Sequence, residues 1–437
     1  MNDIAHVRGP ISRSAKEDLA FLQKRRSREY RFRAMGISAI IFALSCLIVL
    51  FGSIIGKGYS AFLQTEIKLT VSLGEKTVIF ADRLRPTSAE LRKIDFNSYI
   101  RKSLVDQFPD VDSRRDKKKL YGLVSSGARH ELKELIRANP QLIGTKIDLW
   151  VLAADDVDMY VKGYLDINSP EMYRRLNNKE VAWIDSLVEN GSLQKKFNWR
   201  FFNNADSREP EMAGLRGALV GSAYTLLVTF LLSLPIGVMA AIYLEEFAPR
   251  NRVTEFIEVN INNLAAVPSI VFGLLGLGIF LNFFGMARSA PIVGGLVLSL
   301  MTLPTIIIVS RVALKAVPGS IREAAMGIGA SKMQVVLHHV LPLGMPGILT
   351  GAILGMARAL GETAPLLMIG MVAFIADIPK SVNDSATVLP VQVFLWADSP
   401  ERAFVERTSA AIMVLLLFLL ATNLIVILMR HKFERKW

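Results

Sequence analysis

An arginine and a glutamate four residues apart interrupt a long apolar run in the C-terminal half of the chain. Arg358 and Glu362 lie within the run from Gly347 to Phe374. At about 1.5 Å per residue, Arg358 would lie roughly 18 Å along a helix that starts at Pro346, near the middle of a bilayer about 30 Å thick. A charge at that depth is costly and normally faces a bundle interior or a water-filled cavity. We therefore expect this pair to face the inside of a membrane protein.

The chemistry suited to this pair is the binding of an oxyanion. The guanidinium of Arg358 stays charged and presents forked hydrogen-bond donors. Glu362, one helical turn away, could hold the guanidinium when no anion is present and release it when an anion arrives. The alternative is a permanent intrahelical ion pair that only neutralises Arg358. Thr363 follows directly in the sequence, and Arg358, Glu362 and Thr363 are our candidates for a substrate path.

A second polar stretch, Pro318 to Leu349, lies between two long apolar runs and is predicted to form a helix, a turn and a second helix outside the bilayer. Ser320 and Glu323 have the spacing of a capping box, in which two side chains satisfy free backbone amides at a helix start. Gly329 can adopt the left-handed conformation that ends such a helix. The pattern therefore predicts a helical hairpin between two spans.

Ser331 and Pro342 mark the predicted ends of the second helix. Ser331 could cap its start, and Pro342 is expected to stop it because proline lacks a backbone N–H. Between them, apolar residues recur at helical spacing: Met333, Val336, Leu337, Val340 and Leu341. One apolar face is therefore expected on this helix.

This hairpin resembles the EAA loop of ABC importer permeases, a short helix pair that seats in a groove on the ATP-hydrolysing subunit. The match covers six positions in register: Glu323, Ala324, Ala325, Gly329, Leu341 and Pro342. It departs from the family pattern at His339, where the family usually has an aliphatic residue. The resemblance implies that these six residues couple the chain to a partner ATPase. The alternative is an ordinary helical hairpin.

The composition excludes an ordinary soluble enzyme. Of the 437 residues, 51% are hydrophobic, and the mean hydropathy is +0.36. Runs of about 20 apolar residues can cross a bilayer as helices, and lipid offers no partner for unpaired backbone groups. Six runs qualify: Ala34–Ile55, Gly217–Leu244, Leu264–Phe284, Pro291–Ala313, Gly347–Phe374 and Ala410–Met429. The predicted fold class is an all-α polytopic membrane protein with six transmembrane helices and an inserted α+β extracytoplasmic domain.

The formal charge of +12 is concentrated beside the predicted spans, in residues 24–33 and 430–436. Positive residues at such places fix the orientation of a membrane protein, and here they predict that both termini are cytoplasmic. We therefore do not expect nucleic-acid binding. The single cysteine, Cys46, lies in the first apolar run, so no intrachain disulfide can form.

Residues 56–215 are mixed in charge and long enough for a folded domain on the far side of the membrane. Alternation of apolar and polar residues predicts a strand at Ile67–Leu73, with weaker strand candidates at 147–153 and 195–202. Helices are predicted at 89–108, 130–138 and 171–188. We find no metal-ligand spacing or nucleophile pattern in this region.

These observations predict five consecutive parts. They are a cytoplasmic basic tail (1–33), a first transmembrane helix (34–55), an extracytoplasmic α+β domain (56–215), a five-helix permease core (216–429) that contains a cytoplasmic coupling loop (318–345), and a cytoplasmic tail (430–437). A cleaved signal peptide is the competing interpretation of the first run. Its polar lead is long and no clear cleavage site follows, which favours an uncleaved anchor.

Four stretches narrow the resemblance: Gly237–Asn251, Val267–Gly278, Arg322–Lys332 and Arg358–Leu367. Together they are similar to the A-type permease subunit of the phosphate ABC importer, which has a MetI-like core. The resemblance covers roughly Gly217 to Trp437 and also embraces the first span. Residues 56–215 depart from the short form of that family and resemble an insertion in some longer members.

The resemblance implies a bacterial inner-membrane complex with three partners: an ATP-binding subunit, a second, C-type permease subunit and a periplasmic phosphate-binding protein. The chain has no G-x-x-x-x-G-K-[ST] loop, so we expect it to be a transport subunit and not an enzyme, with ATP bound by the partner. No catalytic residue, metal or cofactor is expected in this chain.

Several other functions are consistent with parts of the sequence. Importers of sulfate, molybdate or phosphonate use the same coupling loop. A membrane sensor would use the outer domain to bind a signal. An ion-coupled secondary transporter should often show inverted repeats and discontinuous spans, and we find no such repeat.

Overall fold

The computed structural model describes residues 13–73, 94–167 and 169–433, and the chain divides into two units, residues 1–56 and 57–437. Most of α1 (Arg13–Gly58) makes up the first unit. The predicted basic tail is therefore helical from Arg13 onward, because arginine, lysine and glutamate favour helices. Residues 1–12 and 434–437 of the two predicted tails lie outside the described residues.

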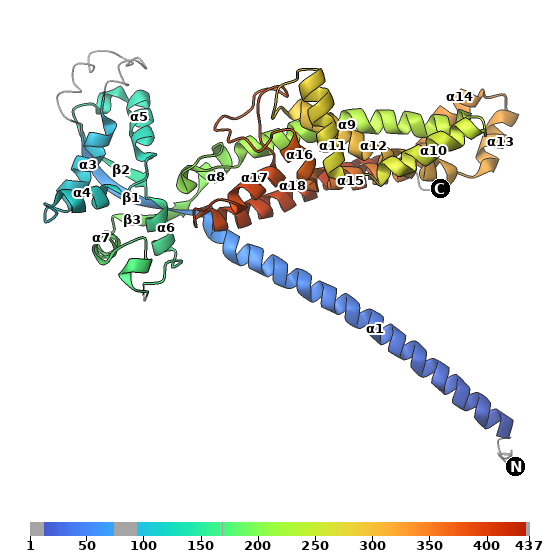
Figure 1. The fold of residues 1–437 in the computed structure, drawn as a ribbon, viewed down its shortest axis with the longest axis horizontal. Helices are drawn as coiled ribbons and strands as arrows, with labels where there is room; N and C mark the ends of the chain where they lie inside the picture. The colour runs from blue at the N-terminus through green and yellow to red at the C-terminus, as the bar shows by residue number, and fades with distance from the viewer. Residues whose placement is uncertain (1–12, 74–93, 168, 434–437) are drawn as a thin grey trace, which may run out of the picture. The chain divides into compact units, whose positions relative to one another are not determined.

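The second unit begins with a sheet domain, residues 63–215, which follows the short 3-10 helix η1 (Tyr59–Phe62). Its three strands are antiparallel in the order β2-β1-β3, with β1 (Leu63–Ser72) between β2 (Lys146–Leu152) and β3 (Leu193–Phe197) (Figure 1). Glu66 pairs with Leu152 of β2, and Leu63 pairs with Phe197 of β3. The start of β1 and the end of β3 therefore lie side by side.

The centre of the sheet domain is built on β1. Ile67, Leu69 and Val71 are fully buried on one face of the strand, which confirms the alternation predicted for this segment. Helices α3 (Phe96–Gln107) and α5 (Ala128–Ala138) contribute buried residues to the same hydrophobic core. The sheet is thus covered on one face by helices.

The remaining short elements of this domain are α4 (Arg114–Tyr121), η3 (Pro140–Leu142), α6 (Asp155–Val161), η4 (Glu171–Tyr173), α7 (Asn178–Glu189), α8 (Trp199–Asn203) and η5 (Pro210–Met212).

The strand predicted at 147–153 and the helix predicted at 130–138 are confirmed. The helix predicted at 171–188 begins only at Asn178, because Asn177 and Glu180 form a capping box there. The strand predicted at 195–202 ends at Phe197, because the Asn198 side chain caps α8. The helix predicted at 89–108 is α3, and residues 89–93 lie outside the described residues.

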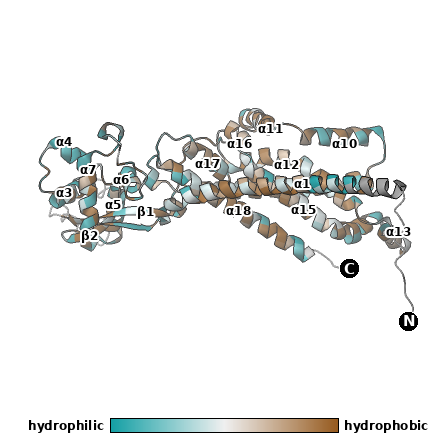
Figure 2. Ribbon diagram, turned by 90° about the horizontal axis from the view of Figure 1, so that it is seen from below, coloured by the Kyte–Doolittle hydropathy of each residue, from teal (hydrophilic) through white to brown (hydrophobic). Residues whose placement is uncertain are grey.

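A bundle of long apolar helices forms the rest of the second unit (Figure 2). Its first half contains α9 (Arg216–Ile242), η6 (Tyr243–Phe247), α10 (Arg252–Ala265), α11 (Ser269–Gly276), η7 (Leu277–Phe283) and α12 (Pro291–Lys315). The second half contains α13 (Gly319–Gly327), α14 (Lys332–Val335), η8 (Val336–Val340), α15 (Leu341–Gly361), α16 (Ala364–Met368), α17 (Leu389–Ala397) and α18 (Phe404–Phe433). Helix α12 packs against both α9 and α15, and α15 packs against α18.

Five helices among the described residues are long and apolar enough to cross a membrane, or six if one bent pair counts as a span. In the bent pair, α10 and the α11–η7 helix lie at 98° to each other. The third predicted span, Leu264–Phe284, begins at the end of α10 and otherwise corresponds to α11–η7. Pro268 lies at the break, where its ring disfavours helical backbone at Val267 and it supplies no N–H.

The fifth span lies elsewhere than predicted. The predicted run was Gly347–Phe374, but α15 ends at Gly361, and Glu362 is extended with φ −81° and ψ 120°. The apolar helix begins much earlier, at Lys332, and α14, η8 and α15 form one stretch of 30 residues. Hydropathy alone could not locate this span because apolar residues continue past the end of the helix.

Candidate functional site

Helices α13 and α14 form the predicted hairpin, with Gly329 at its turn. Gly329 has φ +92°, a conformation that side-chain-bearing residues rarely adopt, so the left-handed turn is confirmed. A Cβ atom at this position would meet no other atom within 4 Å. The requirement for glycine is therefore conformational and does not come from crowding.

The two helices begin differently from each other. Ser331 accepts a hydrogen bond from the Gln334 amide, and the Gln334 side chain accepts one from the Ser331 amide, which confirms the cap predicted at Ser331. The capping box predicted from Ser320 and Glu323 is wrong. Helix α13 begins after Pro318 without a side-chain cap, because Ser320 lies inside the helix and not before it.

Pro342 does not stop the second helix, contrary to our prediction. Helix α15 begins at Leu341, so Pro342 occupies its first turn, and the π-helical turn η8 joins it to α14. Proline is tolerated in a first turn, and a π turn changes the hydrogen-bond register just before it. The second helix of the hairpin is therefore continuous with a helix that is long and apolar enough to cross a membrane.

Arg322 fastens α13 to two other helices, and sequence analysis did not single it out. Its Nη2 atom lies 2.7 Å from Glu246 Oε1, and its Nε atom also donates to that carboxylate. Nη1 and Nη2 donate to the carbonyls of Val317 and Leu314, at 2.6 and 2.9 Å. The paired acids Glu245 and Glu246 at the end of α9 were the available signal. We call this group of contacts the Arg322 clasp.

A neighbouring ion pair holds the same end of α12. Arg311 Nη2 lies 2.7 Å from Glu258 on α10 and 3.6 Å from Glu245 on η6. Together with the Arg322 clasp, it joins α10, α12, α13 and η6 at one end of the bundle.

The outer face of the hairpin is apolar and open. Ala325 is buried, whereas Glu323 and Ala324 are exposed. Four large apolar side chains are exposed by 42–83%: Met326, Ile328, Met333 and Leu337. Val336 and Val340 are buried as the helical spacing predicts, but Met333 and Leu337 point outward. Exposed apolar groups that gather in this way are typical of a protein-binding surface.

The structure brings Arg358 and Glu362 together at the end of α15, not within a longer helix. Arg358 Nε lies 3.6 Å from Glu362 Oε1, with side chains exposed by 41% and 23%. Arg358 is in the last helical turn, and Glu362 follows the helix. Thr363 is half-buried and precedes α16. The guanidinium is therefore only partly engaged by its partner.

Helices α11 and α16, each of which follows a break in the helical backbone, pack against each other, and α16 begins directly after Glu362 and Thr363. A Cβ on Gly273 of α11 would lie 2.7 Å from Pro365 Cα of α16, and one on Gly276 would lie 2.3 Å from a Val297 methyl. These two glycines therefore allow α11 to approach α16 and α12 closely. The break before α11 and the break before α16 are thus held together by α11–α16 packing.

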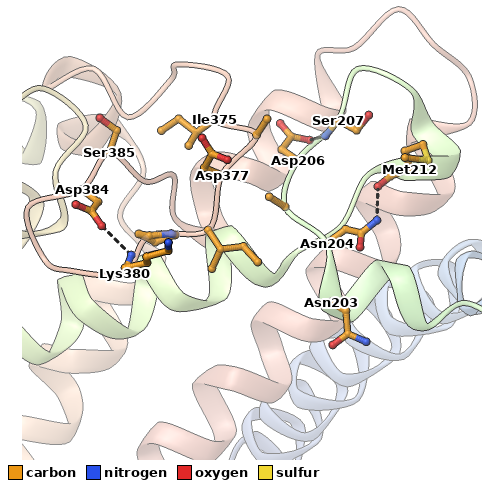
Figure 3. Close-up of a pocket in the computed structure, with 14 residues that line it drawn as sticks. Asn203, Asn204, Asp206, Ser207, Met212, Ile375, Asp377, Lys380, Asp384 and Ser385 are labelled. Carbon is orange, nitrogen blue, oxygen red and sulfur yellow. Dashed lines mark hydrogen bonds between the residues drawn. The ribbon is translucent and has the colours of Figure 1, made fainter. Parts of the chain in front are cut away.

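A cleft of about 930 Å³ lies between the chain that follows α8 and the loop before α17 (Figure 3). Its labelled polar groups include Asp206, Asp377, Lys380 and Asp384. Burial raises the pKa of Asp206, which accepts a hydrogen bond from Trp396. Hydrogen bonds from the Lys380 amide and Ser381 lower the pKa of Asp384. Because the cleft carries three carboxylates and only one amine, it is poorly suited to bind a free anion.

A buried ion network joins the sheet domain to the first turn of α18. Lys162 Nζ lies 2.6 Å from Asp158 and 2.8 Å from Glu406, and all three side chains are at most 7% exposed. Thr65 donates to Asp158 through its amide and its hydroxyl, and Ser60 donates to Glu406. The carboxylates of Asp158 and Glu406 are therefore stabilised both by the Lys162 ammonium and by hydrogen bonds from neighbouring hydroxyl and amide groups.

Two further carboxyl groups of the sheet domain have raised pKa values: Glu211 is buried, and Glu131 is half-buried beside Arg200. Burial raises the pKa of Glu211 to about 7, although Ser125 donates a hydrogen bond to it at 2.6 Å. Burial also raises the pKa of Glu131 to about 7, against the opposing charge of Arg200.

Two family models match the chain. Residues 233–437 match the "Binding-protein-dependent transport system inner membrane component", and residues 20–171 match a "Domain of unknown function (DUF3333)". The first match covers the Arg322 clasp, the hairpin and Arg358. The second covers most of the sheet domain.

Curated relatives match the bundle at moderate identity. "Probable ABC transporter permease protein YqgI" of Bacillus subtilis is 37% identical over 188 residues, 43% of this chain and 63% of that protein. "Phosphate transport system permease protein PstA 1" of Mycobacterium tuberculosis (strain ATCC 25618 / H37Rv) is 32% identical, covering 51% of this chain and 71% of that protein. The "Phosphate transport system permease protein PstA" of Yersinia pestis is 34% identical, covering 51% and 73%. A solved MetNI methionine ABC transporter matches with TM-score 0.40 and 17% identity, over 51% of this chain and 96% of that one.

Proposed function

Because the chain belongs to the family of inner-membrane components of binding-protein-dependent transport systems, we propose that it is the A-type permease subunit of a phosphate importer. The substrate is inferred from relatives named as phosphate transport permeases, which are 32–34% identical to this chain. A forked cation at Arg358 suits an oxyanion. The proposed complex contains a C-type permease, an ATP-binding subunit and a phosphate-binding protein.

The proposed topology follows from the hairpin. If α13 and α14 meet an ATP-binding subunit, they face the cytoplasm, and the sheet domain at the other end of the bundle faces the outside. Both termini are then cytoplasmic. Labelling of single cysteines at Lys118 and Lys332 in a Cys46→Ser background should be opposite-sided, and same-sided labelling would contradict the topology.

In the proposed mechanism, the ATPase docks on Met326, Ile328, Met333 and Leu337. Movement of the hairpin reaches α9 through the Arg322 clasp and reaches α15 through the continuous helix. Arg358 lies at the far end of that helix. Phosphate then displaces Glu362 from the guanidinium, and closure of the hairpin restores the pair and releases the anion.

The observation that carries this proposal is the unbroken 30-residue helix from the hairpin to Gly361. The experiment is uptake of labelled phosphate by the assembled complex in vesicles. Arg358→Lys keeps the charge but loses the fork, so uptake should fall while assembly holds. Wild-type uptake by Arg358→Gln would remove Arg358 from the path. Transport of sulfate or molybdate in preference to phosphate would overturn the substrate assignment alone.

A further inference from the structure

The base of the sheet domain carries aromatic and basic side chains that nothing in the second unit covers among the described residues. We call Tyr59, Lys195, Lys196, Phe197 and Trp199 the basal patch. Trp199 is 65% exposed, Tyr59 58% and Phe197 44%, and both lysines are exposed, with Lys196 Nζ 3.7 Å from Glu66 Oε2. Phe197 and Trp199 are in contact and exposed together, which indicates a contact surface.

The backbone places this patch at the level of η1. Strand β3 runs antiparallel to β1 and ends at Phe197, which pairs with Leu63. The next residue, Asn198, donates its amide to the Phe62 carbonyl at 2.8 Å and its side chain to the Ala61 carbonyl at 3.0 Å. Trp199 therefore lies level with the residues that directly follow α1.

The patch is also rigidly connected to the bundle by aromatic contacts. The Phe197 ring lies 4.9 Å from Trp199 and 6.1 Å from Phe202. Phe202 contacts Phe201, whose ring is buried and lies 6.3 Å from Trp396. The exposed rings of Phe197 and Trp199 are therefore held in place by a continuous chain of aromatic contacts that ends at Trp396.

The height of the patch above the apolar part of the bundle can be estimated from the chain. A Cβ on Gly58 would lie 2.9 Å from the backbone of Ala410, so the end of α1 touches α18 where its apolar run begins. From Gly58 to Ala61 the chain is 3-10 helical, which rises about 2 Å per residue, or about 6 Å in all. The polar headgroup layer of a bilayer is about 5–8 Å thick on each side.

We propose that the basal patch is seated in the lipid headgroup layer on the side of the membrane that carries the sheet domain. Tryptophan and tyrosine have an apolar body and a polar tip and concentrate at this layer. Lysine ammonium groups bind anionic lipid phosphates there. The basal patch has both aromatic and lysine side chains, and it lies about 6 Å from the start of the apolar run of α18, a distance that falls within the headgroup layer. This contact holds the sheet domain at a fixed tilt on the bilayer, and it does not depend on which anion the permease carries.

The test measures where a nitroxide at position 199 lies. The full chain, in a Cys46→Ser background, carries Trp199→Cys with a spin label, in vesicles of phosphatidylethanolamine and phosphatidylglycerol. Glu134→Cys on α5, an exposed site of the same domain, is the control. The expected result is a several-fold higher ratio of oxygen to nickel-chelate collisions at position 199 than at position 134. Equal ratios place position 199 in water and overturn the proposal.

Shielding of the label and a second labelling site provide two further tests of the lipid contact. If the label at 199 is shielded from both oxygen and the nickel chelate, a protein covers the patch and the lipid assignment is wrong. If Trp199→Cys does not fold, Lys195→Cys with native Trp199 replaces it, with the same expected ratio. In the Trp199→Cys protein, replacing both Lys195 and Lys196 by glutamine should remove any dependence of the ratio on phosphatidylglycerol content. A ratio at position 195 equal to the control again overturns the proposal.

Discussion

The two ends of the helix bundle use charged residues in opposite ways. At the hairpin end, the Arg322 clasp and the Arg311 pair are partly exposed, and they lie beside an open apolar surface. At the sheet-domain end, Lys162, Asp158 and Glu406 are almost completely buried and satisfied by hydroxyl and amide donors. Partly hydrated pairs can be exchanged at little cost, whereas a buried network is stable only when complete. One end is therefore suited to movement and the other to a fixed joint.

The largest effect should come from breaking the buried network. Lys162→Met removes the ammonium that lies within 2.8 Å of two buried carboxylates, and loss of one partner of a buried pair typically costs about 3–5 kcal/mol. We expect a clear fall in the unfolding midpoint of the purified protein in detergent. The matched control is Lys68→Met, which removes a surface pair with Asp148 and should cost less than about 1 kcal/mol. Equal losses for both variants would contradict a special role for burial.

Glu211 should make the stability of the same end depend on pH. Its pKa is raised from 4.5 to about 7, so the folded state holds the proton more tightly than the unfolded state. The stabilisation is complete below pH 4.5 and is lost as pH rises through about 7. Glu211→Gln should therefore flatten this slope and raise the free energy of unfolding at pH 8 by about 2–3 kcal/mol.

Denaturant unfolding at several pH values measures this effect. Glu131 titrates in the same window, so part of the slope should remain in Glu211→Gln and disappear when Glu131→Gln is added. An unchanged slope in the double variant would contradict the assignment.

Arg322→Gln tests the difference between the hairpin end and the sheet-domain end, because at the hairpin end it should reduce transport more than stability. The loss of charge-assisted hydrogen bonds that are partly exposed should cost about 2 kcal/mol. The hairpin then moves without moving α9, so uptake per ATP hydrolysed should fall severely in an assembled complex. Arg322→Lys should recover part of it. The control is Arg252→Gln, an exposed arginine at the start of α10. Normal coupling in Arg322→Gln would remove the clasp from the mechanism.

The smallest effect is expected at the hairpin turn. Gly329→Val forces a β-branched residue into left-handed backbone, at a cost of about 1 kcal/mol or more. Gly327→Ala is the matched control, because neither position has an atom within 4 Å of the added Cβ and only Gly329 has positive φ. Stability and uptake should fall in Gly329→Val and stay near wild type in Gly327→Ala. Equal behaviour would show that the turn conformation is not needed.

The sequence was informative wherever the deciding contacts are local. Alternation located β1, the Ser331 spacing located a cap, and Gly329 located a left-handed turn, because each depends on neighbours within a few residues. Hydropathy failed at Pro268 and Gly361, since apolar residues continue through both breaks. Pro342 was misjudged because a π turn precedes it.

Long-range polar partners were not predictable in the same way. Lys162 and Glu406 are 244 positions apart in the chain, and Arg322 and Glu246 are 76 apart. Residue type and spacing do not say which distant residues form such a pair, although the adjacent acids Glu245 and Glu246 were a signal for one side of the second pair. The residues predicted to couple the chain to an ATPase came from a family resemblance and not from packing, and the fixed joint at the sheet-domain end was missed entirely.

The unbroken helix from Lys332 to Gly361 acts mechanically as a lever. At about 1.5 Å per residue its 30 residues span about 45 Å, and α12 and α18 support it along its length. The π turn η8 and Pro346 lie within this helix, but neither breaks it, so a movement of one end is carried to the other. In the proposed mechanism, the nucleotide state of the partner and the orientation of Arg358 are therefore set together, and a stalled load at one end is felt as resistance at the other.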